Sequence, residues 1–181
     1  MGKLLYTAIQ SLDGYTVDAD GSFEWAFPSE EVHAFAADLG RSVGTYLYGR
    51  RMYEVMKVWE TLDNPEPVMQ DFATVWRAAT KIVVSTTLES VESERTTIVR
   101  ELDPLFVEQL KAEGDVAIDG PTLAAHAIRG GLVNELQLLI CPVVVGGGTP
   151  YLPADVRLDL TLLDERRFES GVVYLRYAVT G

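Results

Sequence analysis

Apolar and polar residues follow two different spacings along this chain, and each change of spacing marks a predicted element. Apolar runs of about four to eight residues between turn signals are typical of buried strands, whereas apolar positions three and four residues apart are typical of helices. The strand pattern occurs at residues 3–9, 44–48, 81–85, 96–99, 115–118 and 135–145. The helical pattern occurs at residues 29–39, 50–58 and 68–79, from residue 104 onward, and at 121–129.

The last part of the chain has no helical pattern. Residues 158–179 are predicted to form an antiparallel hairpin that turns near Ser170-Gly171. Strands that alternate with helices, followed by such a hairpin, predict an α/β fold with a mostly parallel sheet, an antiparallel edge and helices on both faces. Asn64-Pro65-Glu66-Pro67 breaks the helical pattern, but we find no repeat or linker and expect one domain over residues 1–181.

The charge of the chain narrows the classes of partner. With 27 acidic and 15 basic residues, the 181-residue chain has a formal charge of −12. This charge disfavours nucleic acid and anionic membranes as partners. A phosphorylated cofactor needs only local positive potential, which Arg50, Arg51 and Lys81 are in a position to supply. No apolar run is long enough to span a bilayer.

Cysteine and histidine are too sparse to suggest a disulfide or a metal site. Cys141 is the single cysteine, and we interpret it as a small buried apolar residue rather than a reactive thiol. His33 and His126 are far apart in sequence, and neither has a neighbouring ligand residue, so we expect no metal. A chain without paired cysteines or a secretory signal is expected in the cytoplasm.

Two predicted strands run directly into helices through glycine. Gly120-Pro121-Thr122-Leu123 follows one strand, and Gly49-Arg50-Arg51 follows another. The first amides of a helix have no internal partner, and the helix dipole adds positive potential, so both turns are suited to an anionic ligand. The alternatives are an ordinary strand-to-helix turn at Gly120 and solvated arginines at Arg50 and Arg51. Together, the two turns favour a nucleotide cofactor.

Other polar and aromatic residues lie near predicted strand ends, where open α/β sheets bind ligands. Ser85 and Thr86 offer hydroxyl groups to ribose or phosphate, although turns use the same residues. Trp25 and Tyr53 are candidates to flank a flat ring, although most aromatic residues belong to the core. Three carboxylates complete this set: Asp13, Glu54 and Asp119.

In combination these segments resemble the dihydrofolate-reductase-like superfamily, and most closely the reductase domain of the bacterial riboflavin-biosynthesis deaminase-reductase. Six segments match in family order over nearly the whole chain, a specific signal although each one is weak alone. They are Ser11-Leu12-Asp13-Gly14, Tyr48-Gly49-Arg50-Arg51-Met52-Tyr53-Glu54, Val84-Ser85-Thr86-Thr87-Leu88, Gly120-Pro121-Thr122-Leu123-Ala124, Gly131-Leu132-Val133-Asn134-Glu135-Leu136 and Pro142-Val143-Val144-Val145-Gly146-Gly147-Gly148.

The resemblance implies a three-layer α/β/α fold, an NADPH-dependent reductase acting on a small planar heterocycle that is similar to a pterin or pyrimidine, and a homodimer. Arg50, with Arg51 beside it, would meet the 2′-phosphate, and the backbone around Ala8 and Ile9 would face the nicotinamide. Trp25 would lie near the nicotinamide, with Asp13, Tyr53 and Asp119 around the substrate. The residues implied to hold NADPH are Ala8, Ile9, Gly49, Arg50, Arg51, Ser85, Thr86, Gly120, Pro121, Thr122 and Leu123.

This chain departs from the family pattern at several positions. Met52 replaces a frequent threonine, and Asp119-Gly120 replaces a common Gly-Gly pair. Ile118 stands where the riboflavin enzymes carry a substrate-binding glutamate, which argues against their phosphorylated substrate, and we find no deaminase domain. The acidic residue that serves folate reduction would lie on the first helix, which offers Glu30, Glu31 and Asp38. The alternative function is a non-catalytic nucleotide- or flavin-binding homodimer that keeps the fold.

Overall fold

The computed structural model of the protein describes residues 1–63 and 66–181. The predicted break at Asn64-Pro65 therefore lies outside the described residues. The strands are β1 (Leu4–Ser11), β2 (Tyr15–Val17), β3 (Thr45–Gly49), β4 (Thr80–Val84), β5 (Thr96–Val99), β6 (Val116–Asp119), β7 (Glu135–Cys141), β8 (Thr149–Pro150), β9 (Leu160–Arg167) and β10 (Val173–Val179). The helices are the short 3-10 helix η1 (Glu24–Ala26), α1 (Glu30–Arg41), α2 (Arg50–Met56), α3 (Val58–Thr61), α4 (Pro67–Ala78), α5 (Pro104–Glu113) and α6 (Pro121–Arg129).

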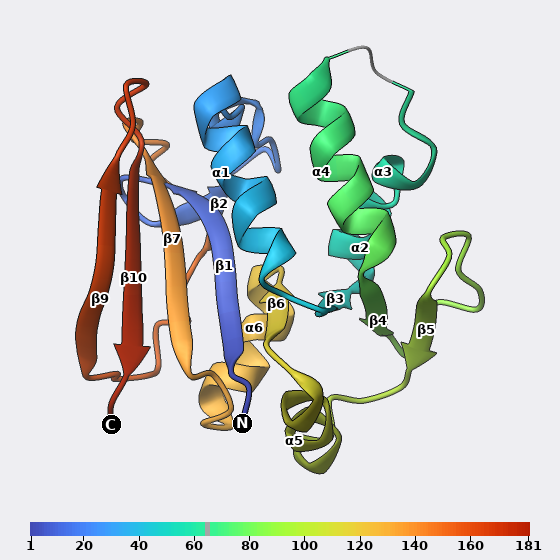
Figure 1. Ribbon diagram of the computed structural model, residues 1–181. Helices are drawn as coiled ribbons and strands as arrows, with labels where there is room; N and C mark the ends of the chain where they lie inside the picture. The colour runs from blue at the N-terminus through green and yellow to red at the C-terminus, as the bar shows by residue number, and fades with distance from the viewer. Residues whose placement is uncertain (64–65) are drawn as a thin grey trace.

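Eight of these strands form one sheet in the order β5-β4-β3-β6-β1-β7-β10-β9 (Figure 1). The six strands from β5 to β7 are parallel, and β10 pairs antiparallel with both β7 and β9. The predicted mostly parallel sheet with an antiparallel terminal hairpin is confirmed. The hairpin places β9 at the outer edge of the sheet, where one side of its backbone has no partner strand among the described residues.

Helices cover both faces of the sheet and give the implied three-layer α/β/α sandwich, which is confirmed (Figure 1). Residues of α5 and α6 pack with Leu4, Tyr6 and Leu47 on one face. On the other face, α2 and α4 cover β3 and β4, and α1 covers β7 and β10. This arrangement follows from the sequence, because strands buried on both faces are apolar along their whole length.

Capping residues fix where two helices begin. The Ser29 hydroxyl accepts a hydrogen bond from the Val32 amide at 3.4 Å, and the Asp103 carboxylate accepts one from the Leu105 amide at 2.9 Å. Each side chain satisfies one of the amides that a helix leaves free at its start. Pro104 occupies the first turn of α5, where a missing N–H has no consequence. Both predicted helix starts are confirmed.

Three details of the fold differ from the prediction. β7 ends at Cys141 rather than at residue 145, because Pro142 has no N–H to continue the ladder. The predicted helix over 50–58 is divided into α2 and α3 at Lys57. The two-stranded sheet of β2 and β8 was not predicted, since runs of two or three residues carry no periodic signal.

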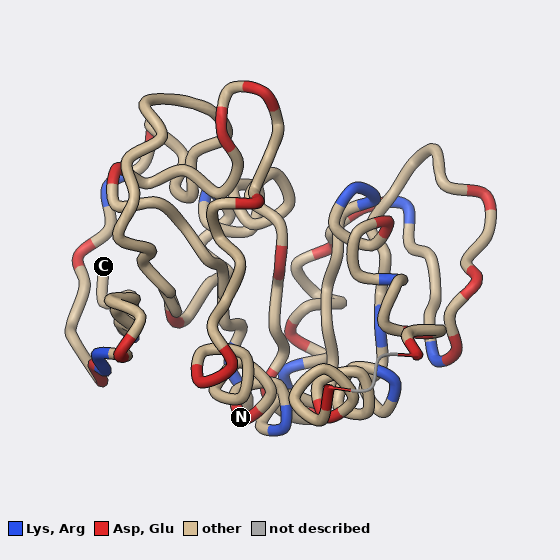
Figure 2. Tube along the Cα trace, turned by 90° about the horizontal axis from the view of Figure 1, so that it is seen from above, with Lys and Arg blue, Asp and Glu red and all other residues tan. Residues whose placement is uncertain are grey.

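The described helices include none that is both long enough and apolar enough to span a bilayer. Acidic positions are distributed around the whole trace, and the basic positions form no broad face (Figure 2). Positive potential in this protein is therefore a local property of particular sites.

Candidate functional site

The parallel strands of the sheet end side by side at one edge. Gly49 at the end of β3 pairs with Val84 of β4, and Tyr48 pairs with Asp119 at the end of β6. β1 continues beyond β6, so that Ala8 and Ile9 pair with β7 alone. The carboxyl ends of parallel strands are where open α/β sheets bind ligands, and the predicted binding residues gather there.

The two glycine turns lie against each other at this edge. A Cβ atom added to Gly49 would stand 3.8 Å from Cβ of Leu123, and one added to Gly120 would stand 3.2 Å from Cβ of Met52. The starts of α2 and α6 are therefore in contact. Gly120 also has a φ of +96°, a conformation that favours glycine.

The first turn of α6 offers free backbone donors. Gly120 has no side chain with which to cap the helix, and Pro121 has no N–H. In the described chain, no hydrogen-bond acceptor is recorded for the amides of Thr122 and Leu123. These two amides at the positive end of the helix dipole can bind an anion.

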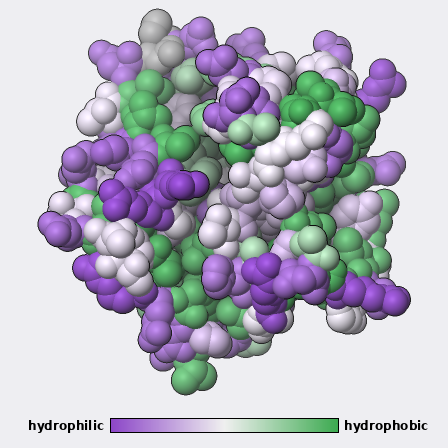
Figure 3. Space-filling model, turned by 180° about the vertical axis from the view of Figure 1, so that it is seen from behind, coloured by the Kyte–Doolittle hydropathy of each residue, from purple (hydrophilic) through white to green (hydrophobic). Residues whose placement is uncertain are grey.

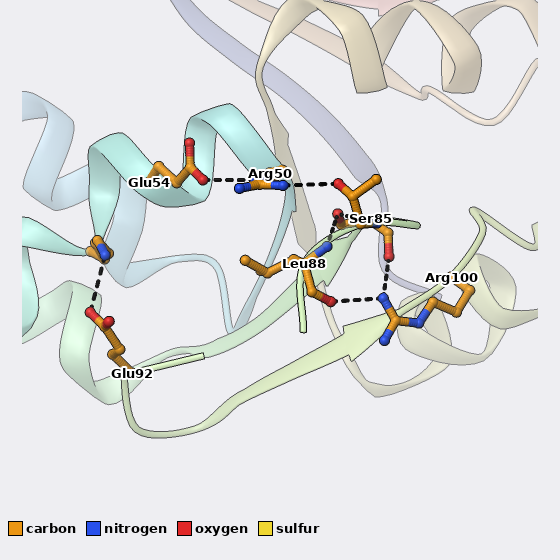
Figure 4. Close-up of polar contacts among 8 residues, drawn as sticks. Arg50, Glu54, Ser85, Leu88, Glu92 and Arg100 are labelled. Atoms are coloured by element: carbon orange, nitrogen blue, oxygen red, sulfur yellow. Dashed lines mark hydrogen bonds and ion pairs between the residues drawn. The ribbon is translucent and has the colours of Figure 1, made fainter. Parts of the chain in front are cut away.

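Arg50 connects the start of α2 with the loop that follows β4 (Figure 4). Its Nε donates to Glu54 at 2.8 Å, and its Nη1 donates to the Thr87 hydroxyl at 3.0 Å. The guanidinium group is about half exposed, with a side-chain accessibility of 48 %, so one side of it faces solvent. A cavity of about 330 Å³ opens beside it and is lined by Arg50, Tyr53, Glu54, Lys57, Thr87, Leu88, Glu89, Ser90 and Glu92.

Ser85 shapes the loop through its side chain and its backbone (Figure 4). Its hydroxyl accepts hydrogen bonds from the amides of Thr87 at 3.3 Å and Leu88 at 3.0 Å. Nη1 of Arg100 donates to the carbonyl oxygens of Ser85 at 2.9 Å and Leu88 at 2.8 Å. Sequence reasoning missed Arg100, because it follows the next strand and no local pattern connects it with Ser85.

Arg50, Arg51 and Lys81, the three predicted sources of positive potential, differ in exposure. Arg51 is exposed, and no partner is recorded for its side chain within the described residues. Lys81 does not contribute, which corrects the expectation, because it is fully buried with Nζ 4.3 Å from the Trp76 ring centroid. Its Nζ donates to the carbonyl oxygen of Trp76 at 3.3 Å. Burial lowers the pKa of Lys81. Of the three, Arg50 and Arg51 remain candidates to supply positive potential at this edge.

Asp119 is a partly exposed carboxylate between the two turns. No hydrogen bond to its side chain is recorded within the described residues. Burial raises the pKa of Asp119 to about 7. The position of Asp119 near a predicted strand end makes it a candidate from the sequence. Its raised pKa could not be predicted, because burial depends on neighbours from distant parts of the chain.

The side chains of Asp13 and Tyr53 form hydrogen bonds with the backbone of neighbouring loops. The Asp13 carboxylate accepts hydrogen bonds from the amides of Val145 at 3.1 Å and Gly146 at 2.8 Å. A hydrogen bond from Ser11 and these two amides lower the pKa of Asp13, which disfavours it as a proton donor. Tyr53 is buried, and its hydroxyl accepts from the Glu92 amide at 3.0 Å. These bonds hold the loops around residues 145–146 and residue 92 in place.

Trp25 lies on the α1 side of the sheet. Its ring is half-buried in the same cluster as Ile9, and its Nε1 donates to the Ser22 carbonyl oxygen at 3.2 Å. Cys141 is buried in this cluster too, and burial raises the pKa of its thiol, as expected of a core residue. Within residues 1–63 and 66–181, no group of three or more metal-ligating side chains is present.

The model of the RibD C-terminal domain family matches residues 2–174. The chain belongs to this family. A curated relative, the uncharacterized protein YyaP of Bacillus subtilis (strain 168), is 25 % identical in an alignment of 185 positions that covers 99 % of this chain and 96 % of YyaP. The predicted resemblance to the reductase domain of the riboflavin deaminase-reductase is confirmed.

Solved structures share the fold at low sequence identity. A putative riboflavin biosynthesis protein from Shewanella sp. PV-4 has a TM-score of 0.78 at 19 % identity, covering 99 % of each chain. A pyrimidine reductase-like protein from Corynebacterium diphtheriae has a TM-score of 0.71 at 14 % identity, covering 99 % of this chain and 92 % of its own. The Thermotoga maritima deaminase/reductase gives 0.68 at 12 % identity, with 99 % of this chain matching 57 % of that longer chain.

The first helix, α1, carries the three carboxylates that are candidates for the acidic residue of folate reduction. Glu31 accepts a hydrogen bond from Arg166 at 3.0 Å, and Asp38 is paired with Arg41. Glu30 lines a cavity of about 370 Å³ between the starts of α1 and α4, together with Phe27, Pro28, His33, Glu66, Pro67, Val68 and Met69. Glu30 therefore borders this cavity, whereas Glu31 and Asp38 are paired with arginines.

Proposed function

We propose that this RibD-type domain is an NADPH-dependent reductase that transfers hydride to a small planar heterocycle similar to a pterin or pyrimidine. Membership of the RibD C-terminal family supports a reductase. The observation that carries the cofactor assignment is the contact between the two glycine turns, in which Gly49 lies beside Leu123 and Gly120 lies beside Met52. Donors from both turns then face one ligand.

The residues at this edge fit a dinucleotide. The free amides of Thr122 and Leu123 suit a diphosphate, and Gly120 allows a close contact with Met52 that a side chain would disturb. Arg50 and Arg51 suit the 2′-phosphate, because a guanidinium group binds phosphate through paired donors. The hydroxyls of Ser85 and Thr86 complete the cofactor-binding set, with the turn residues Gly49 and Pro121 shaping the backbone.

We place the substrate region beyond the end of β6, where β1 continues without β6 beside it. Ala8 and Ile9 of β1 are left next to the end of β6, and they would face the nicotinamide, which supplies the hydride when bound. Trp25 flanks this region from the α1 side, and Asp119 borders it from β6. Asp13 and Tyr53 would contribute by holding the surrounding loops in place.

The proposed assembly is a homodimer. β9 is a long edge strand that carries three exposed leucines, Leu160, Leu162 and Leu163, with accessibilities of 39 %, 47 % and 47 %. An exposed apolar edge strand is a liability unless another chain covers it, and a second copy would do so. Light scattering after size exclusion tests this, and a monomer at micromolar concentration would contradict it.

Titration with NADPH tests the cofactor. The nicotinamide fluorescence of NADPH is expected to change saturably with the purified protein, and NADH is expected to bind more weakly. Saturable binding followed by NADPH oxidation in the presence of a pterin, flavin or quinone supports a reductase. Binding without oxidation by any acceptor supports the non-catalytic alternative, and absence of binding contradicts the proposal. The absorbance spectrum of freshly purified protein tests the flavin-binding alternative, because a bound flavin would absorb visible light.

The surface seen from behind is hollowed along its middle, with strongly hydrophilic side chains on one flank (Figure 3). A hollow of this kind is the shape in which proteins bind small planar ligands. Crystals soaked with NADPH would show whether the dinucleotide lies in it.

A further inference from the structure

Asp119 differs from the other two carboxylates predicted near the strand ends. Glu54 is bonded to Arg50 at 2.8 Å, and Asp13 accepts from the amides of Val145 and Gly146. Asp119 has no recorded hydrogen-bond partner within the described residues, although it is only partly exposed. A carboxylate that is removed from water without a partner is disfavoured in its charged form.

The strand next to Asp119 presents tyrosines on the same face of the sheet. Tyr48 pairs with Asp119 between β3 and β6, and burial first, with the charge of Asp119 in addition, raises the pKa values of Tyr46 and Tyr48. Tyr6 and Tyr151 belong to the cluster on the other face, and the same two causes raise their pKa values. From α2 it is the uncharged Met52 that lies against the adjoining glycine, Gly120. No Lys, Arg or His of the described chain is recorded as a partner of Asp119.

A bound dinucleotide would bring more negative charge to the same place. Its diphosphate would lie at the amides of Thr122 and Leu123, three and four residues after Asp119. Two negative groups in one partly buried site cannot both be charged without a large electrostatic penalty. A carboxyl group can avoid that penalty by taking up a proton, whereas the diphosphate cannot.

We propose that Asp119 takes up a proton from solvent when the dinucleotide binds, and that its neutral carboxyl group then donates a hydrogen bond to the ring that accepts hydride. This inference rests on the proposed function. It identifies Asp119 as a residue that selects the substrate. The atom facing it must be a hydrogen-bond acceptor, such as a ring nitrogen or carbonyl oxygen, and an anionic group there is disfavoured.

The raised pKa of Asp119, about 7, makes this exchange accessible near neutral pH. Below pH 7 the group is already protonated, so binding needs no further proton. Above pH 7 it must be protonated as the cofactor binds, and the apparent affinity then falls by up to about tenfold for each pH unit.

The test is NADPH binding to the wild type, to Asp119→Asn and to the control Asp155→Asn, between pH 6 and 9. Asp155 lies beyond the far end of α6, paired with Arg129. We expect about tenfold weaker binding at pH 8.5 than at pH 7 for the wild type and the control, and a change below about twofold for Asp119→Asn. The titration is repeated with NADH, which has no 2′-phosphate. Because that phosphate itself titrates near pH 6, this control separates its pH dependence from that of Asp119.

A second measurement needs no variant. Mixing the wild type with NADPH at pH 8 in weak buffer with an indicator dye is expected to show uptake approaching one proton for each site. Equal pH profiles for wild type and Asp119→Asn, or no proton uptake, would overturn the inference while leaving the cofactor assignment in place. Failure of the wild type to bind NADPH at every pH would overturn both.

Discussion

The indole Nε1 of Trp76 donates a hydrogen bond to the hydroxyl oxygen of Tyr48 at 3.0 Å, between α4 and β3. Both side chains are fully buried, and Tyr46 stacks on Tyr48 with ring centroids 5.6 Å apart. This bond fixes α4 against the strand that leads to the Gly49 turn. The position of the candidate site therefore depends on a polar contact deep in the core.

Replacing Tyr48 with phenylalanine should destabilise the protein, because the indole N–H loses its acceptor while it stays buried. We expect a loss of about 1–3 kcal/mol in the free energy of unfolding, measured by urea denaturation. The matched control is Tyr46→Phe, whose hydroxyl has no hydrogen bond recorded in the described chain, and which should lose less. Equal losses for the two variants would contradict the importance of the Trp76 bond.

Replacing Gly120 with alanine should be far more damaging than replacing Gly49. Gly120 has a φ of +96°, and an added Cβ would meet Met52 at 3.2 Å, whereas Gly49 has a φ of −74° and open space to 3.8 Å. We expect Gly120→Ala to lose about 1–3 kcal/mol of stability and Gly49→Ala less than about 1 kcal/mol. Thermal unfolding measures both, and similar melting temperatures would show that the turn is not constrained.

These two glycines also show what the sequence could and could not establish. The positions of both turns were predictable, because an apolar run that ends in glycine before a helical pattern is a local signal. Their contact was not, since it depends on β3 and β6 being neighbours although 66 residues of chain, from Arg50 to Asp115, separate them. Strand order in a parallel sheet is set by the packing of the whole domain.

Local signals likewise do not show which bonds a side chain makes in the fold. Asp13 and Tyr53 were selected by position, but their bonds to residues 145–146 and 92–93 are formed by distant loops. Lys81 carries a charge in the sequence and is buried in the fold. Arg100 gave no signal at all, because its task is to bind backbone carbonyl groups of another loop.

Replacing Arg50 with alanine should weaken NADPH binding more than NADH binding. The guanidinium group is half exposed and held beside Thr87, so it can meet a 2′-phosphate that NADH does not have. We expect at least about a tenfold loss for NADPH, or 1.4 kcal/mol, and little change for NADH. Arg129→Ala, at the other end of α6, is the control. Equal losses for the two dinucleotides would remove the 2′-phosphate assignment.

Glu135 should make stability depend on pH. Its carboxylate is buried, with Oε2 2.6 Å from Nε of Arg176 and Oε1 bonded to Lys3. Burial alone would raise the pKa of Glu135, but the bonds from Arg176 and Lys3 outweigh it, and the pKa is lowered. A lowered folded-state pKa contributes stability above the unfolded value, about 4.3 for glutamate, and that stability is lost as the pH falls through the folded value.

Urea unfolding of the wild type and of Glu135→Gln between pH 3 and 7 measures this contribution. We expect the variant to be less stable by about 1.5–3 kcal/mol at pH 7, where a charged, hydrogen-bonded carboxylate has been removed. The difference should shrink as the pH falls below about 4, because the wild-type carboxylate then becomes protonated and neutral. Glu165→Gln on the exposed strand β9 is the control and should change little. A Glu135→Gln deficit that is constant with pH would mean that packing, rather than charge, accounts for the loss.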